Sequence, residues 1–167
     1  MLSKKMGNAL NEQLNAELYS SYLYLSMSAY FTSTNLNGFA NWMRVQAQEE
    51  LMHAMKFYDF INERDGKVTL TQIEAPKTKW NSPLEVFEDV YKHECKVTSL
   101  IHNLVDLAVT EKDYATNTFL QWFVTEQVEE ESSALEIVDK LKLMGDNSVA
   151  QFMIDGELAQ RTFTTGE

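Results

Sequence analysis

The sequence predicts an all-α protein: an antiparallel four-helix bundle with one long crossover and a short fifth helix near the C-terminus. Apolar residues recur every three or four positions along four long stretches, which is the period of an amphipathic helix. Only 6 Gly and 2 Pro interrupt a chain of 167 residues, which favours long helices. Because this length suits one hydrophobic core, residues 1–167 are expected to form a single domain.

The first helix is expected over about residues 4–32 and carries two apolar faces. A helix that is apolar on two faces is buried on two sides. One face is interpreted as the bundle core and the other as a contact with a second subunit, although aromatic side chains covering a loop would look the same. The first face holds Leu10, Leu14, Leu18, Ser21, Leu25 and Ser28, and the second holds Tyr19, Tyr22, Leu23, Met27 and Tyr30.

The second helix is expected over about residues 39–64, and Asp65-Gly66 ends it. Residues 66–82 then read as an extended connection, which is long for a loop. A helix of this size is roughly 40 Å long, and an extended segment of this size reaches roughly 55 Å. The connection can therefore cross the whole bundle, so that the second and third helices run parallel.

The third helix is expected over about residues 83–110, with Ser82 as its N-cap and Glu85 at the capping-box position. The fourth is expected over about 113–144, with Asp113 as its N-cap. The fifth is expected over about 147–157.

Composition excludes several classes of protein. The net charge of −11 argues against nucleic-acid binding, which needs a basic surface. The single cysteine, Cys95, cannot form an internal disulfide. The sequence contains neither a run of about 18 apolar residues nor the apolar core of a signal peptide, so no membrane span and a cytoplasmic location are expected.

An internal repeat with an offset of 77 residues links the two halves of the chain. Helical periodicity can imitate such a repeat by chance, but the matched residues carry chemistry. A helical hairpin used twice would produce this match and would direct the matched side chains towards one point. Glu17 matches Glu94, Glu50 matches Gln127, His53 matches Glu130, Glu49 matches Glu126, and Trp42 matches Phe119.

Four of these glutamates lie on faces of the helices that are otherwise apolar: Glu17, Glu50, Glu94 and Glu130. A buried carboxylate is costly unless it is paired or binds a metal. No Lys or Arg lies three or four residues from any of the four. Two divalent ions would balance four carboxylates, and oxygen donors with the His53 imidazole suit iron or manganese. A lone Glu-x-x-His on a helix usually has no function, so this prediction depends on the whole set.

The chain resembles the ferritin family, and within it the non-haem ferritins of bacteria and archaea. The resemblance extends over nearly the whole chain. It is carried by Glu17-Leu18-Tyr19, Tyr22-Leu23-Tyr24, Gly38-Phe39-Ala40-Asn41-Trp42-Met43, Glu49-Glu50-Leu51-Met52-His53, the stretch around His93-Glu94, and Glu126-Gln127-Val128-Glu129-Glu130-Glu131. Ferritin-like di-iron proteins are known to take one Glu from each of two helices and Glu-x-x-His from the other two. Glu50-x-x-His53 fits this pattern, whereas Gln127-x-x-Glu130 departs from it, so the second iron is expected to bind more weakly.

The resemblance implies a hollow shell of 24 subunits that oxidises Fe(II) with dioxygen or peroxide and stores Fe(III). It implies two irons per subunit. Glu17, Glu50 and His53 would hold the first iron, Glu50 would bridge, and Glu94 with Glu130 would hold the second.

Other roles are also implied by the resemblance. Gln127 would face the oxidant, and Tyr24 would be a hydrogen-bond partner or electron donor rather than only a core tyrosine. Glu49, Glu126 and Glu129 would form a third iron site, unless they are simply a solvated acidic face.

Departures from related families limit which of their properties the resemblance implies for this chain. Bacterioferritins bind haem through a methionine at the position of Leu51, so no haem is expected. The neutral residues Asn117 and Leu120 replace the acids that line an access channel in animal ferritins, so the sequence does not predict where iron enters. A rubrerythrin-like peroxidase, a mini-ferritin and a helical bundle without catalytic activity are the competing interpretations.

Overall fold

The computed structural model describes residues 2–164 and contains five helices, with no strand among these residues. The all-α prediction is therefore confirmed. Residue 1 and residues 165–167 of the expected domain lie outside the described residues. The helices are α1 (Lys4–Ser33), α2 (Asn37–Glu63), α3 (Pro83–Glu111), α4 (Tyr114–Met144) and α5 (Ser148–Leu158).

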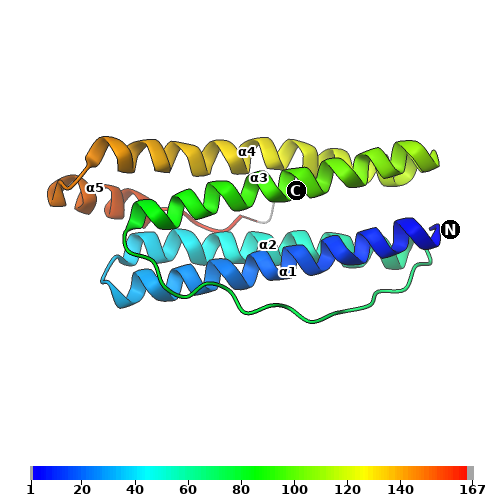
Figure 1. Ribbon diagram of the computed structural model, residues 1–167, viewed down its shortest axis with the longest axis horizontal. Coiled ribbons are helices and arrows are strands. Elements are labelled where there is room, and N and C mark those ends of the chain that lie inside the picture. Colours follow the sequence, from blue (N-terminus) through cyan, green and yellow to red (C-terminus); the bar gives the residue numbers. More distant parts are fainter. Residues whose placement is uncertain (1, 165–167) are drawn as a thin grey trace.

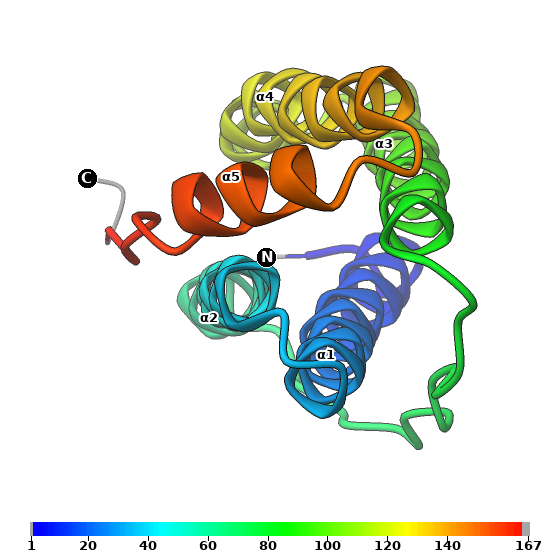
Figure 2. The ribbon, with the colours of Figure 1, turned by 90° about the vertical axis from the view of Figure 1, so that its left-hand side faces the viewer.

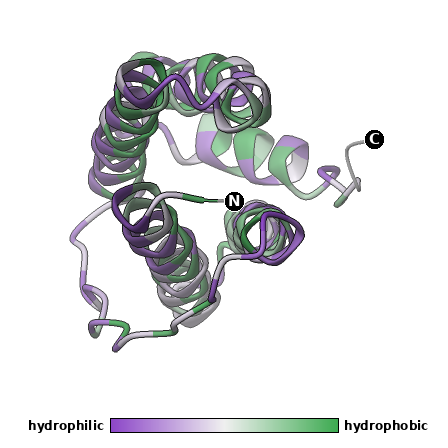
Figure 3. Ribbon diagram, turned by 90° about the vertical axis from the view of Figure 1, so that its right-hand side faces the viewer, coloured by the Kyte–Doolittle hydropathy of each residue, from purple (hydrophilic) through white to green (hydrophobic). Residues whose placement is uncertain are grey.

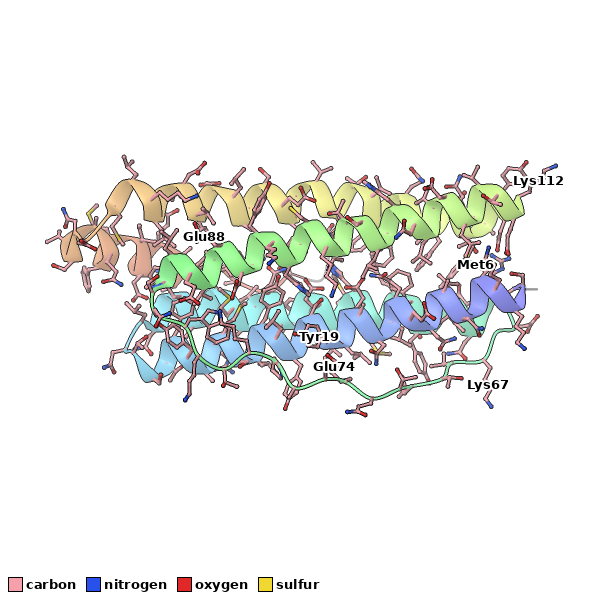
Figure 4. All side chains as sticks on the ribbon, viewed as in Figure 1. Met6, Tyr19, Lys67, Glu74, Glu88 and Lys112 are labelled. Atoms are coloured by element: carbon pink, nitrogen blue, oxygen red, sulfur yellow. The ribbon has the colours of Figure 1, made fainter. Side chains whose placement is uncertain are left out.

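The four long helices form two antiparallel pairs, α1 with α2 and α3 with α4 (Figure 1). The extended segment that follows α2 runs the length of the bundle beside α1, so that α3 starts at the far end and runs parallel to α2 (Figure 1). Side chains of α1 hold this segment: the Asn11 amide donates to the Lys67 carbonyl at 3.1 Å, and the Ser26 hydroxyl donates to the Lys77 carbonyl at 2.7 Å. Figure 4 shows Tyr19 of α1 beside Glu74 of the crossover, and both residues line one surface pocket.

The helix starts follow local capping chemistry. The Ser82 hydroxyl accepts a hydrogen bond from the Glu85 amide at 3.1 Å, and Asp113 accepts from the Thr116 amide at 3.1 Å. Helix α2 has no cap from its own first residues and begins at Asn37, two residues before the expected position. A distant residue explains this start, because Asp155 of α5 accepts from the Gly38 and Phe39 amides at 2.8 and 3.1 Å.

Helix α5 packs against this end of the bundle, between α2 and α4 (Figure 2). Each long helix carries hydrophilic and hydrophobic residues around its circumference, as an amphipathic bundle requires (Figure 3). None of the helices within residues 2–164 is long and apolar enough to cross a membrane.

The expected core face of α1 was wrong in one part. Leu25 is 49% exposed, whereas Tyr24, which was on neither expected face, is fully buried. Leu23 and Met27 were expected at a subunit contact but are buried in the core of this chain. The buried face therefore follows Glu17, Ser20, Tyr24 and Met27 rather than the spacing through Leu25. An aromatic residue and a leucine at adjacent positions both suit a core, and only the packing decides between them.

The apolar core is divided into two clusters, one on each side of a layer of buried polar side chains. In α2, Ala47 belongs to one cluster and Ala54 to the other, with Glu50 and His53 between them. The same division occurs in the other three long helices. The polar layer includes Glu17, Glu50, His53, Glu94, Gln127 and Glu130.

Candidate metal centre

Four carboxylates from four different helices are buried at the middle of the bundle. They are at most 6% exposed: Glu17 in α1, Glu50 in α2, Glu94 in α3 and Glu130 in α4. Within residues 2–164 none of them forms an ion pair with Lys or Arg. Since buried charges require a compensating partner, the protein alone leaves this site short of positive charge.

Glu17, Glu50 and His53 form the first group of potential ligands. Each residue offers one donor atom, and the donor atoms lie within 4.8 Å of one another. The His53 Nδ1 atom is 3.3 Å from the Glu50 Oε2 atom. Glu17 Oε2 and His53 Nε2 are buried and have no hydrogen-bond partner in the described structure. Such unpaired buried atoms are costly, and a bound cation would satisfy them.

His53, Glu126 and Glu130 form a second group of potential ligands, and their donor atoms also lie within 4.8 Å of one another. The His53 Nε2 atom points towards this side, 3.9 Å from the Glu126 Oε1 atom. His53 therefore stands between two groups of carboxylates. The expected pairing of Glu130 with Glu94 around a second iron remains a prediction.

Glu94 is held by hydrogen bonds. The Tyr24 hydroxyl donates to Glu94 Oε1, and the Gln127 amide donates to Glu94 Oε2 at 3.2 Å. The same amide group lies 3.2 Å from the Thr98 hydroxyl. These contacts place Tyr24 and Gln127 beside the centre, where they fix the orientation of the Glu94 carboxylate.

Two glutamines next to the carboxylates were not among the predicted site residues. The Gln13 amide donates to Glu17 at 2.8 Å. The Gln46 amide donates to Glu50 at 3.1 Å and to Glu130 at 2.8 Å, so it joins α2 to α4. Each glutamine precedes its carboxylate by four residues, on the same helix face. This spacing could have marked each glutamine as a neighbour of its own carboxylate, but not the contact that Gln46 makes with Glu130 of α4.

The electrostatics of the four buried carboxyl groups follow from their burial. The pKa of Glu17, Glu50, Glu94 and Glu130 is raised from 4.5 to about 8. Loss of hydration is the main cause, and repulsion between neighbouring carboxylates adds to it. Near neutral pH these groups therefore carry protons that a metal ion must displace.

This arrangement predicts how the stability of the metal-free protein depends on pH. Carboxyl groups whose pKa is higher in the folded state stabilise it below pH 4.5, and this contribution is lost as the pH rises through about 8. We expect the midpoint of urea denaturation to fall between pH 5.5 and 8.5, and saturating Zn²⁺ to restore it at the higher pH. A Glu17→Gln variant should show a smaller fall. A midpoint that rises with pH in the metal-free protein would contradict the proposed electrostatics.

Beyond the centre, the three glutamates expected at a third site line a pocket of about 280 Å³ between α2 and α4. Glu49 and Glu126 are partly buried, and Glu129 is exposed. Burial raises the pKa of Glu49, and the nearby Arg161 guanidinium opposes this shift. Arg161 was not predicted at the site, and nothing in the local sequence pattern connects it with Glu49.

The donors suit iron. Carboxylate oxygens and one imidazole nitrogen are ligands for Fe and Mn, and Cys95 of α3 is not part of either donor group. The fold and this layer of side chains define a class of protein, the four-helix bundles with a carboxylate-rich metal centre.

Comparison with known proteins identifies the family. The family model described as a ferritin-like domain matches residues 7–144. The bacterial non-heme ferritin of Bacteroides fragilis is 51% identical and covers 96% of this chain and 100% of its own. The one from Staphylococcus saprophyticus subsp. saprophyticus is 45% identical, with 100% of both chains covered. The open-pore ferritin from the archaeon Archaeoglobus fulgidus is 59% identical over 96% of this chain and 98% of its own, with a TM-score of 0.96. The chain belongs to the ferritin family.

Proposed function

We propose that this ferritin takes up Fe(II), oxidises it at a dinuclear centre with dioxygen or peroxide, and stores the Fe(III) inside a shell of 24 subunits. The observation that carries this proposal is the layer of four buried carboxylates without a Lys or Arg partner in the described structure. Two Fe(II) ions would balance these charges. Membership of the ferritin family supports iron storage in general.

In this proposal each iron has its own ligands. Glu17, Glu50 and His53 hold the first iron, which satisfies the unpaired Glu17 oxygen. Glu94 and Glu130 hold the second, and Glu50 bridges the two. The second iron lacks an imidazole of its own and is bound more weakly. Two Fe(II) ions supply the two electrons that reduce one dioxygen to hydrogen peroxide, or one peroxide to water.

The surrounding residues position these ligands. The Gln46 amide holds Glu50 and Glu130 together, and Gln13 holds one oxygen of Glu17 so that the other faces the metal. The Tyr24 hydroxyl and the Gln127 amide fix Glu94. Such supporting contacts typically change metal affinity or activity by about 10- to 100-fold when they are removed.

The test is rapid mixing of the protein with two Fe(II) per chain in air, with the oxidation of Fe(II) followed by absorbance. We expect fast oxidation in the wild type and a fall of at least roughly 100-fold in Glu17→Ala, because a ligand should matter more than a supporting contact. Glu12→Ala, an exposed glutamate of α1, is the matched control and should keep the wild-type rate. Wild-type rates in Glu17→Ala would contradict the assignment of the centre.

Particle mass separates the competing assemblies. A shell of 24 chains of 19.2 kDa has a mass of about 460 kDa. A 12-subunit mini-ferritin would have half that mass, and a bundle without a shell would be smaller still. Oxidation no faster than in buffer, with the 24-subunit mass intact, would leave a storage shell without a ferroxidase centre.

A further inference from the structure

The segment after α5 turns back across α2 and brings Arg161 to the acidic pocket beside the centre. The Arg161 Nη2 atom is 2.5 Å from the Glu49 Oε2 atom. Its guanidinium carbon lies 4.3 Å from the centroid of the Trp42 ring, close enough for a cation–π contact. These two contacts hold one positive charge against one specific glutamate.

The segment is fixed by residues of α2. The Asn41 side-chain amide donates to the Leu158 carbonyl at 3.3 Å and to the Arg161 carbonyl at 2.9 Å. Within the last turn of α5, just before this segment, Asp155 accepts from two amides of α2. The position of Arg161 is therefore set by its own backbone and not only by attraction to Glu49.

The pocket connects this ion pair with the dinuclear centre. It is lined by Glu49, Glu126, Glu129, Arg161 and the proposed iron ligand Glu130, among others. The buried His53 Nε2 atom has no hydrogen-bond partner in the described structure and lies 3.9 Å from Glu126. One cation faces several carboxylates here, so most of the negative charge in the pocket is uncompensated.

We propose that Arg161 is an internal competitor for the third metal ion of this pocket. The Arg161 guanidinium pairs with the Glu49 carboxylate when no third ion is bound, and a metal ion that binds Glu49 must displace the guanidinium. This inference rests on the proposed function, because it takes the pocket to lie on the path of iron to or from the centre. The Arg161 and Glu49 side chains are 25% and 16% exposed, so the ion pair borders the pocket and is not sealed inside the core. A divalent cation can therefore displace the guanidinium, and the third site exchanges iron instead of trapping it.

The test uses Zn²⁺, which binds oxygen and nitrogen ligands without being oxidised, in titration calorimetry of the assembled protein. We expect two tight sites and one weaker site per chain in the wild type. In Arg161→Gln the third site should bind at least about tenfold more tightly, which corresponds to roughly 1.4 kcal/mol. Arg161→Lys keeps a positive charge and should retain a weak third site. Adding Glu49→Gln to Arg161→Gln should abolish the gain.

The control is Arg44→Gln, which removes an exposed positive charge from α2, the helix that carries Glu49. This variant should leave the Zn²⁺ affinity of the third site at the wild-type value, so that a gain in Arg161→Gln cannot come from net charge alone. Hydrogen exchange of residues 158–164 shows whether the segment stays in place without the guanidinium. An unchanged or undetectable third site in Arg161→Gln, with both tight sites present, would overturn the role of Arg161. If the wild type binds no Zn²⁺ at two tight sites per chain, this result would instead overturn the proposed function, and the role of Arg161 with it.

Discussion

Replacement of Glu50 by glutamine is expected to make the metal-free protein more stable while it removes rapid iron oxidation. Glu50 is 2% exposed, and burial together with repulsion from Glu130 raises its pKa to about 8. Above pH 8 a neutral amide removes the cost of burying a charged carboxylate, and the amide oxygen can still accept the hydrogen bond from Gln46. We expect a rise in Tm of about 2–4 °C for each kcal/mol gained at pH 8.5.

The same change removes the proposed bridge between the two irons. Oxidation at two Fe(II) per chain should therefore slow by at least roughly 100-fold. The two effects have opposite signs, so a folding defect cannot produce both of them. Glu63→Gln, at an exposed position near the end of α2, is the matched control and should change neither quantity. A stabilised variant that still oxidises iron at the wild-type rate would show that Glu50 is not a ligand.

Gly38→Ala is expected to detach α5 from the bundle. A glycine-to-alanine change inside a helix normally stabilises it by about 1 kcal/mol. At this position the new methyl carbon would lie 1.7 Å from the Asp155 carbonyl oxygen and 2.6 Å from the Asp155 carbonyl carbon. These are backbone atoms, so only a movement of α5 or of the start of α2 can relieve the overlap. Overpacking of this kind costs about 1–3 kcal/mol or more.

Hydrogen exchange measures this effect directly. Peptides from residues 148–164 should lose protection in Gly38→Ala, whereas peptides from the middle of α1 and α3 should not. Gly7→Ala is the matched control, because a methyl group at Gly7 of α1 meets nothing within 4 Å and should be stabilising. Detachment of α5 also withdraws Arg161, so the third Zn²⁺ affinity should rise as in Arg161→Gln. A stabilised Gly38→Ala variant with full protection of α5 would contradict the close packing of α5 on α2.

Much of the fold could be predicted from local patterns. Helical periodicity, the Ser82 and Asp113 caps and the length of the crossover are properties of short stretches, and they indicate four long helices and the parallel course of α2 and α3. The boundary that differed most clearly was the start of α2. Its two extra residues depend on Asp155, which lies 117 residues from Gly38 in the chain.

The composition of the buried polar layer was also accessible from the sequence. The repeat matches Glu17 with Glu94 and His53 with Glu130, because a helical hairpin used twice repeats its inward positions. The supporting glutamines were missed because an amide on a helix face does not reveal what it contacts. Gln46 matters because one amide group reaches carboxylates on two helices, which only the packing of α2 against α4 creates.

The sequence by itself therefore determined the helical bundle, the family resemblance and the set of charged residues that lie on apolar faces. These follow from periodicity and from the cost of burying charge, which act on each helix separately. The tertiary structure alone decided that the buried face of α1 includes Tyr24 and not Leu25, and that Glu94 is held by Tyr24. It also decided that Arg161 meets Glu49. Contacts of this kind depend on how separate helices pack, and no pattern within a single helix carries that information.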